Sequence, residues 1–253
     1  MGAKVVAITG GAQGIGRAIS YAFAEAGYAV SLADPVEDAG EEAAAHIREL
    51  GVSCLYERAD TSREEDVTRW IARTTKELGC PHVLVNNAGI MANKPFLELS
   101  MDDFDRVQAV NVRGTVMCSQ AVAREMVKQN IGGAIINISS TRAVMSEANT
   151  EAYTASKGAI SALTHGMAIS LGSYGIRVNS ISPGWIETSD WQFSGRAKAP
   201  HHSKADNAQH PVGRVGVPDD IAKACLFLAE SADFMTGQNI TIDGGMTVKM
   251  IYV

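Results

Sequence analysis

Short apolar runs alternate with longer stretches of helical pattern along this chain, and that alternation constrains the fold more than any other feature. Runs that are rich in β-branched and aliphatic side chains predict strands. They span residues 4–9, 28–33, 52–58, 82–86, 133–138, 176–181 and 239–242. The run at 134–138 is almost continuously apolar, which suits a sheet covered on both faces. The sequence therefore predicts an α/β fold, a doubly wound parallel sheet of about seven strands with helices on both faces.

Glycines mark the expected ends of the helices between these strands. Gly51, Gly79, Gly132 and Gly175 each come just before a predicted strand, where a helix is expected to stop. No linker, repeat or low-complexity tract is present, so residues 1–253 are expected to form a single domain. The region at about 189–213 shows no clear periodicity, and a long loop of this kind is usually functional or disordered.

The first strand leads into a glycine-rich turn that is suited to binding a phosphate. Gly10, Gly14 and Gly16 follow the run at 4–9 and precede a helix expected over 17–26. Backbone N–H groups and the helix dipole attract an anion at such a turn, and the missing Cβ atoms let it approach. The spacing Gly-x-x-x-Gly-x-Gly differs from the common dinucleotide fingerprint Gly-x-Gly-x-x-Gly. A tight turn without a ligand is the alternative.

An acid at the end of the second strand supports the cofactor interpretation. Asp34 lies about twenty residues past the glycines, where a carboxylate can bind a ribose 2′-hydroxyl. A 2′-phosphate there would bring like charges together, so NAD is expected in preference to NADP. Proteins that bind NADP usually carry a lysine or arginine just after this strand or just before Gly14, whereas Pro35 and Gln13 occupy those places here. Arg17 is the only nearby cation, and it begins the helix instead.

A tyrosine and a lysine stand four residues apart in a predicted helix. Positions i and i+4 share a helix face, so Tyr153 and Lys157 should be neighbours. A cation near a phenol lowers the pKa of the phenol, and a tyrosine tuned in this way can act as an acid or base near neutral pH. The motif alone is weak, because most copies are a solvated pair on a helix surface.

Together these residues resemble the short-chain dehydrogenase/reductase family, and the resemblance covers nearly the whole chain. The matching segments, in family order, are Thr9 to Gly16, Asp60, Asn86 to Gly89, Asn111, Ser140, Tyr153, Lys157 and Pro183 to Thr188. The resemblance implies a Rossmann-like fold and an oxidoreductase that interconverts a secondary alcohol and a ketone or aldehyde. It also implies that the region at 189–213 is a substrate lid.

The resemblance implies four catalytic residues. Tyr153 would exchange a proton with the substrate oxygen while the nicotinamide exchanges a hydride at the same carbon. Lys157 would lower the tyrosine pKa and bind the nicotinamide ribose, and Ser140 would bond the substrate oxygen. Asn111 would hold a water that links Lys157 to solvent. The family's usual spacing back from the tyrosine selects Ser140, and Ser139 is the second choice.

The family's cofactor positions all follow predicted strands, so they should converge on the carboxyl edge of the sheet. The expected cofactor-binding residues are Gly10, Gln13, Gly14, Ile15, Gly16, Asp34, Asp60, Thr61, Asn87, Ala88, Gly89, Tyr153, Lys157, Pro183, Gly184, Ile186 and Thr188. Asp60, the family's acid beside the adenine, could also cap the helix that follows it.

The substrate is expected to be small and polar, such as a sugar, polyol or hydroxy acid. The candidate substrate residues are Ser140, Arg142, Trp185 and Trp191. Glu147, Asn149 and Glu151 should face the mouth of the pocket. Arg142 could hold a carboxylate bidentately, or it could pair with Glu147.

Other functions remain as alternatives. A 3-ketoacyl-carrier-protein reductase normally prefers NADP and needs a basic docking patch. A non-catalytic NAD-binding regulator would lack Tyr153 or Lys157, and both are present. A sugar-nucleotide epimerase or dehydratase would be longer and would carry a Gly-x-x-Gly-x-x-Gly loop.

Composition limits the partners. A net charge of -6 without a basic stripe argues against nucleic acid, and no apolar run is long enough to span a membrane. The first strand begins almost at once, which leaves no room for a signal peptide, so a cytoplasmic protein with reduced cysteines is expected. His201, His202 and His210 lack a cysteine or acid at ligand spacing, so no metal is expected.

Self-association as a homotetramer is expected. The helix after Tyr153 is rich in small residues, which would let a second copy approach closely. The end of the chain, residues 247–253, is apolar and would favour association if exposed. The usual assembly of the family points the same way.

Overall fold

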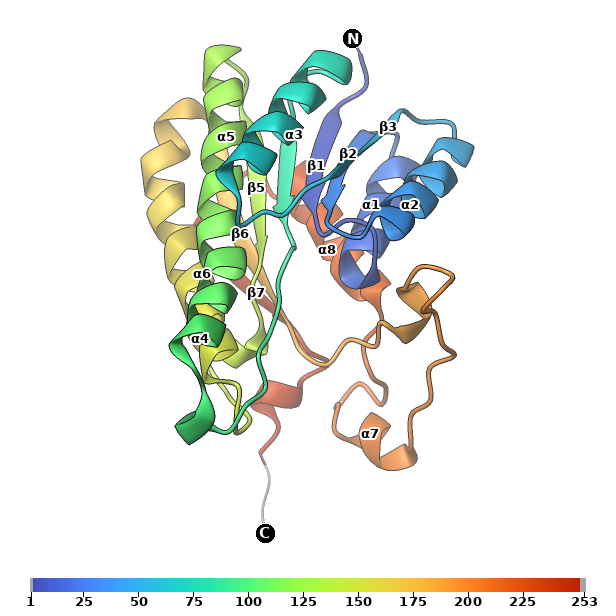
Figure 1. Ribbon diagram of the computed structural model, residues 1–253, viewed down its shortest axis with the longest axis vertical. Coiled ribbons are helices and arrows are strands. Elements are labelled where there is room, and N and C mark those ends of the chain that lie inside the picture. Colours follow the sequence, from blue (N-terminus) through green and yellow to red (C-terminus); the bar gives the residue numbers. More distant parts are fainter. Residues whose placement is uncertain (1, 251–253) are drawn as a thin grey trace.

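A computed structural model describes residues 2–250, and one seven-stranded sheet forms its centre (Figure 1). The strands are β1 (Val5–Thr9), β2 (Ala29–Asp34), β3 (Cys54–Arg58), β4 (Val83–Asn86), β5 (Gly133–Ile138), β6 (Ile176–Pro183) and β7 (Asn239–Ile242). They lie in the order β3-β2-β1-β4-β5-β6-β7, and every neighbouring pair is parallel. The predicted parallel sheet of seven strands is confirmed, and the direction of strand order reverses between β1 and β4.

Helices cover both faces of this sheet. They are α1 (Gly14–Glu25), α2 (Glu37–Glu49), α3 (Glu64–Glu77), α4 (Met101–Gln108), α5 (Gly114–Lys128), α6 (Glu151–Leu171), α7 (Lys204–Ala208) and α8 (Pro218–Glu230). In Figure 1, α1, α2 and α8 lie on one face, and α3, α5 and α6 lie on the other. Each face has its own apolar core, built around Phe23 on one side and Trp70 on the other. Strands packed between two such layers bury both of their sides, which explains their continuous apolar runs.

Glycine ends most of the helices that precede strands, as expected. Gly51, Gly79 and Gly175 have φ values of 84°, 103° and 71°, which favour residues without a Cβ. Gly132 differs, because Asn130 takes the left-handed conformation after α5 with φ 51°. A Cβ on Gly132 would lie 2.7 Å from the carbonyl oxygen of Gly175, so this glycine allows two chain segments to approach closely.

The region expected to be irregular, 189–213, is partly ordered into helix. It contains a 3₁₀ turn, Ser189–Trp191, and the short helix α7, which lies below the sheet in Figure 1. Ser203 and Asp206 form a capping box at the start of α7, and this Ser-x-x-Asp pattern is a local signal for a helix start. None of the helices described for residues 2–250 has the length and apolarity that crossing a membrane requires.

Candidate active site

The glycine-rich turn brings α1 directly against the end of β1. Gly10 and Gly14 have φ values of 60° and 56°, which side chains disfavour. A Cβ on Gly16 would lie 2.0 Å from the carbonyl oxygen of Gly10, so α1 could not pack here with any larger residue. The first N–H groups of α1 therefore face the carboxyl edge of the sheet, where an anion can bind them.

The turn after β4 is tied to this glycine-rich turn by side-chain hydrogen bonds. Asn87 Nδ2 donates to the carbonyl oxygens of Thr9 and Gly10 over 3.1 and 3.0 Å. The hydroxyl oxygen of Thr9 accepts from the backbone N–H groups of Asn87 and Ala88 over 2.9 and 3.0 Å. These bonds join the two central strands where the strand order reverses, which is the usual ligand position in such sheets.

A cavity of about 560 Å³ lies over these turns. The expected cofactor residues that line it are Gly10, Gln13, Gly14, Ile15, Asp34, Asp60, Thr61, Asn87, Ala88, Gly89 and Thr188. Gly16, Tyr153, Lys157, Pro183 and Ile186 are absent from its lining, and Gly184 lines a second cleft instead. Arg106, Ala109 and Val110 also line the cavity, and no local sequence signal pointed to them.

Asp34 contributes a buried carboxylate to the cavity. Its two oxygens accept hydrogen bonds from the backbone N–H groups of Ala12 and Val36, over 3.3 and 3.0 Å. Burial raises the pKa of Asp34, and these two backbone bonds oppose the shift. The acid is thus held at the end of β2 facing the glycine-rich turn.

Two other charged residues near the cavity have structural partners. The carboxylate of Asp60 accepts from the backbone and hydroxyl of Ser62, which precedes α3, so Asp60 closes a turn and does not cap the helix as the sequence had suggested; it also lines the cavity. Arg17 turns away from the cavity, because its guanidinium pairs with Glu42 over 2.8 Å and donates to the carbonyl of Gln192 over 3.0 Å.

The geometry separates the two candidate serines. The Ser139 hydroxyl is buried and donates to the carbonyl oxygen of Lys157, so it supports the backbone of α6. Ser140 follows at the end of β5, and its hydroxyl oxygen accepts from the backbone N–H of Arg142 over 3.1 Å. Only Ser140 lines an adjacent cleft, which supports the choice made from sequence spacing.

Tyr153 and Lys157 lie together on α6, as their spacing predicted. The ammonium of Lys157 lies 5.3 Å from the centre of the Tyr153 ring and donates to the carbonyl oxygen of Ile138 over 2.7 Å. The lysine is 3% exposed, and burial lowers its pKa to about 8.

The expected lowering of the tyrosine pKa is not observed. Burial raises the pKa of Tyr153, and this effect exceeds the opposing effects of the Ser140 side chain and the Arg142 charge. The Lys157 ammonium lies over the ring and donates to a backbone carbonyl, so its position does not offset the desolvation of the hydroxyl. Arg142 therefore emerges as a group that acts on the phenol.

Asn111 lies on a π-helical turn, Ala109–Arg113, that joins α4 to α5. Its amide is fully buried, accepts from the backbone N–H of Ile90 over 2.8 Å, and donates to the Ile90 carbonyl over 2.9 Å. A Cβ on Gly89 would lie 3.5 Å from both the Asn111 Oδ1 and the Lys157 Nζ. Asn111 thus fixes the turn after β4 against the lysine, and the water role implied by the family stays a prediction.

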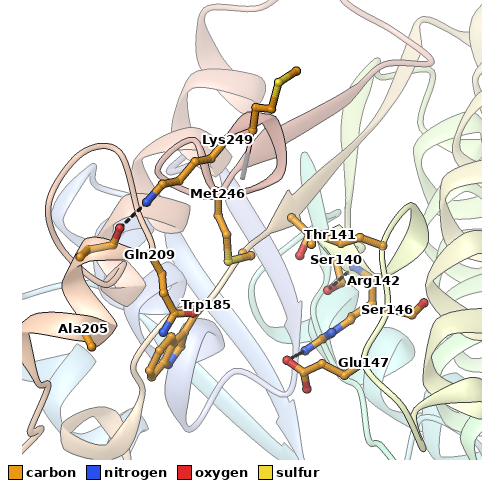
Figure 2. A pocket seen from close by; sticks show the side chains of 14 residues that line it. Ser140, Thr141, Arg142, Ser146, Glu147, Trp185, Ala205, Gln209, Met246 and Lys249 are labelled. Atoms are coloured by element: carbon orange, nitrogen blue, oxygen red, sulfur yellow. Dashed lines mark hydrogen bonds and ion pairs between the residues drawn. The ribbon is translucent and has the colours of Figure 1, made fainter. Parts of the chain in front are cut away.

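A second cleft, of about 1090 Å³, opens beside the catalytic candidates (Figure 2). Three of the candidate substrate residues, Ser140, Arg142 and Trp185, line it, and so does Glu147, which was expected at the mouth of the pocket. Asn149 and Glu151 do not. The residues that sequence reasoning did not identify are Thr141, Met145, Ser146, Ala205, Ala208, Gln209, Met246, Lys249 and Met250.

The two tryptophans near the lid have different surroundings. The ring of Trp185 faces the cleft and packs edge-on against His202, with 5.6 Å between the ring centres. Trp191 packs against Tyr21 of α1 at 6.0 Å and does not line the cleft, so its candidate substrate role is not supported. Among residues 2–250, no three histidine, cysteine or acidic side chains are grouped as metal ligands.

Comparison with known proteins gives consistent matches along the chain. A family model described as enoyl-(acyl carrier protein) reductase matches residues 10–247. An uncharacterized oxidoreductase of Thermotoga maritima is 49% identical over 251 residues, which is 98% of each chain. The structure of an NAD⁺-bound xylitol dehydrogenase superposes with a TM-score of 0.86 at 34% identity, over 96% of this chain and 99% of that one. A gluconate 5-dehydrogenase of Burkholderia cenocepacia, in complex with NADP and tartrate, gives 0.87 at 32% identity, over 99% and 97%.

Proposed function

The chain belongs to the short-chain dehydrogenase/reductase family, and from that premise we propose that it is an NAD-dependent enzyme that interconverts a secondary alcohol and a ketone or aldehyde. The observation that carries the proposal is a continuous series of contacts between the two cavities. Gly89 lines the first cavity and lies against Lys157, Lys157 lies over the ring of Tyr153, and Ser140 beside Tyr153 lines the second cleft.

The first cavity has the groups that a nicotinamide dinucleotide needs. The start of α1 offers backbone N–H groups to a pyrophosphate, and Asp34 offers a carboxylate to ribose hydroxyls. When bound, the cofactor supplies the hydride chemistry.

Tyr153 and its neighbours, beside the wall of the second cleft that Ser140 forms, handle the proton. Tyr153 transfers it to or from the substrate oxygen, and Ser140 donates a hydrogen bond to that oxygen where charge develops. Lys157 places its ammonium over the ring of Tyr153, and burial lowers the pKa of this lysine to about 8. Asn111 positions the turn that carries Gly89 and Ile90.

The reaction is tested with a panel of secondary alcohols and NAD, followed at the nicotinamide absorbance. Tyr153→Phe removes one hydroxyl and should lower kcat/KM by about 10²–10⁴-fold while the Kd for NAD is unchanged. Tyr174→Phe, at an exposed tyrosine after α6, is the matched control and should retain full activity. Half of the wild-type rate in Tyr153→Phe would refute the role of Tyr153, and turnover of acyl thioesters alone would favour the carrier-protein reductase.

NAD is proposed over NADP because Asp34 is the charged group at the end of β2. One structural neighbour is bound to NAD⁺ and the other to NADP, so structural similarity alone does not indicate which cofactor this chain prefers. Arg17 is occupied by Glu42 and cannot turn to a 2′-phosphate without breaking that pair.

The preference is measured as the ratio of kcat/KM for the two cofactors. A difference of about 2–3 kcal/mol corresponds to a ratio of roughly 30–150 in favour of NAD. Asp34→Asn removes the charge with little change in shape and should reduce the ratio, whereas Asp38→Asn, at an exposed acid on α2, should leave it unchanged. Equal efficiencies in the wild type would show that Asp34 does not select the cofactor.

The substrate is proposed to be small and polar. Ser140, Arg142, Glu147, Gln209 and Lys249 give the cleft polar walls. The polyol and sugar acid in the names of the two structural neighbours agree with this class.

A further inference from the structure

The charges in the second cleft differ from those of the chain as a whole. The chain carries a net charge of -6, whereas the cleft is lined by two cations, Arg142 and Lys249, and one acid, Glu147. The two cations lie on opposite walls (Figure 2). A cleft with excess positive charge attracts anions even in an acidic protein.

Arg142 is the cation nearest to the reacting groups. Its backbone N–H is bonded to the Ser140 hydroxyl, and its charge lies near enough to Tyr153 to lower the pKa of the phenol against the larger effect of burial. Figure 2 shows its side chain extending from the Ser140 wall into the space of the cleft. The side chain is 23% exposed, so its charge is only partly screened by solvent.

The partner of Arg142 is easily replaced. Glu147 pairs with the guanidinium, but the glutamate side chain is 72% exposed. An exposed carboxylate gains little from such a pair, because water solvates it almost as well. A substrate carboxylate that enters the cleft can offer the same guanidinium two parallel hydrogen bonds in a less solvated place.

On the basis of the proposed oxidoreductase function, we propose that the substrate is a 2- or 3-hydroxy acid whose carboxylate displaces Glu147 from Arg142. The backbone N–H of Arg142 donates to the Ser140 hydroxyl and the Arg142 charge acts on the Tyr153 phenol, so a carboxylate held by Arg142 lies beside the reacting groups, as the carboxylate of a 2- or 3-hydroxy acid does. Lys249 donates to the carbonyl of Ala208 on the opposite wall, so it adds to the positive field without contacting the carboxylate. Glu147 then competes with the substrate carboxylate for Arg142. It disfavours the binding of anionic ligands more than the binding of neutral ones.

The test compares 2- and 3-hydroxy acids with their primary amides, which keep the carbon skeleton and lose the charge. The wild type should prefer the acid in kcat/KM. Arg142→Gln should lower the ratio of kcat/KM for the acid to kcat/KM for the amide by about 100-fold, because a hydrogen-bonded charge pair is lost. Glu147→Gln, at an exposed position that should not affect folding, should raise the ratio severalfold through a lower KM for the acid. Arg124→Gln, at an exposed arginine of α5, is the matched control and should leave the ratio unchanged.

The outcomes separate this inference from the proposed function. If neutral alcohols or amides are oxidised better than acids in a reaction that Tyr153→Phe abolishes, the hydroxy-acid inference is overturned and the oxidoreductase function stands. If Glu147→Gln leaves the ratio unchanged, Glu147 is not a competitor and the displacement is refuted. If no alcohol of either kind is turned over, the proposed function fails and the inference fails with it.

Discussion

At the scale of single residues, the site keeps a charge where packing alone would favour an apolar group. Lys157 is almost completely buried, and its ammonium has the Ile138 carbonyl as its hydrogen-bond acceptor. Burial lowers its pKa to about 8 from a usual value of 10.5, so the folded protein holds this proton less tightly than the unfolded chain does. The contribution of Lys157 to the free energy of unfolding must therefore rise as the pH increases from about 8 to 10.5.

We therefore expect Lys157→Met to stabilise the protein while it abolishes activity. Removing a buried ammonium should raise the free energy of unfolding near pH 7 by about 2 kcal/mol, after allowance for the lost hydrogen bond. The wild-type lysine becomes neutral as pH rises through about 8, so the advantage of methionine should shrink towards pH 10. Urea unfolding without cofactor at neutral and alkaline pH measures both values.

Lys128→Met, at an exposed lysine on α5, is the control and should change stability little at either pH. A loss of stability in Lys157→Met near pH 7, or an advantage that does not vary with pH, would contradict the argument.

At the scale of elements, two helices near the N-terminus, α1 and α2, hold the first part of the lid, residues 192–194. Arg17 of α1 donates to the carbonyl of Gln192, and Glu42 of α2 accepts from the backbone N–H of Ser194 over 2.9 Å. Arg17 and Glu42 also pair with each other. The Gln192 side chain donates to the carbonyl of Thr188, which lines the cofactor cavity, so the lid begins directly beside that cavity.

Removing the Glu42 carboxylate should release this part of the lid. Arg196 and Lys198 follow it in an exposed segment, where trypsin can cut. We expect Glu42→Ala to be cleaved there about tenfold faster than wild type. Cleavage follows the population of molecules in which this part of the lid is released from the helices. Hydrogen bonds to charged groups such as Glu42 contribute roughly 1.5–3 kcal/mol, so their loss should increase that population. Cleavage sites are identified by mass spectrometry.

Glu41→Ala is the matched control, since Glu41 is the exposed acid next to Glu42 on the same helix. Equal cleavage rates in the two variants would remove Glu42 from this role. Faster cleavage throughout the chain would indicate general destabilisation instead.

At the scale of the whole molecule, one face of α6 has room for a second copy. A Cβ added to Gly158 or Gly166 would meet no atom within 4 Å. Ile169 on the same helix is 85% exposed, and Met250 near the end of the chain is exposed as well. The last part of the apolar end, residues 251–253, lies outside the described residues. Exposed apolar groups beside small residues favour close association between copies.

We expect a homotetramer in solution, measured by light scattering at micromolar concentration. Gly166→Arg should dissociate it into smaller species, because a long charged side chain would occupy the contact. The helix itself should tolerate arginine, which has a better helix propensity than glycine. Thr68→Arg, at an exposed position of α3, should leave the assembly intact. A monomeric wild-type protein would refute this prediction.

The sequence by itself determined the features that depend on neighbouring residues. The seven strands lie within two residues of their predicted limits. Burial on both faces of a parallel sheet requires the continuous apolar runs of central strands such as β1 and β4, whereas the edge strand β7 is half-exposed and alternates polar and apolar residues. The turns at Gly10 and Gly14 could be predicted, because only residues without a Cβ take these conformations at low cost. The shared face of Tyr153 and Lys157 followed from the helix period alone.

Only the tertiary structure decided how distant segments meet. Met246 and Lys249 join Ser140 in one cleft although about a hundred residues separate them, and no local pattern encodes that contact. The pKa of Tyr153 rises because burial by the whole surrounding fold exceeds the effect of any one neighbour. Trp191 packs on Tyr21 instead of facing the cleft, because the path of the lid is set by its bonds to α1 and α2. Desolvation and long-range contacts are sums over the folded chain, so residue spacing alone does not determine them.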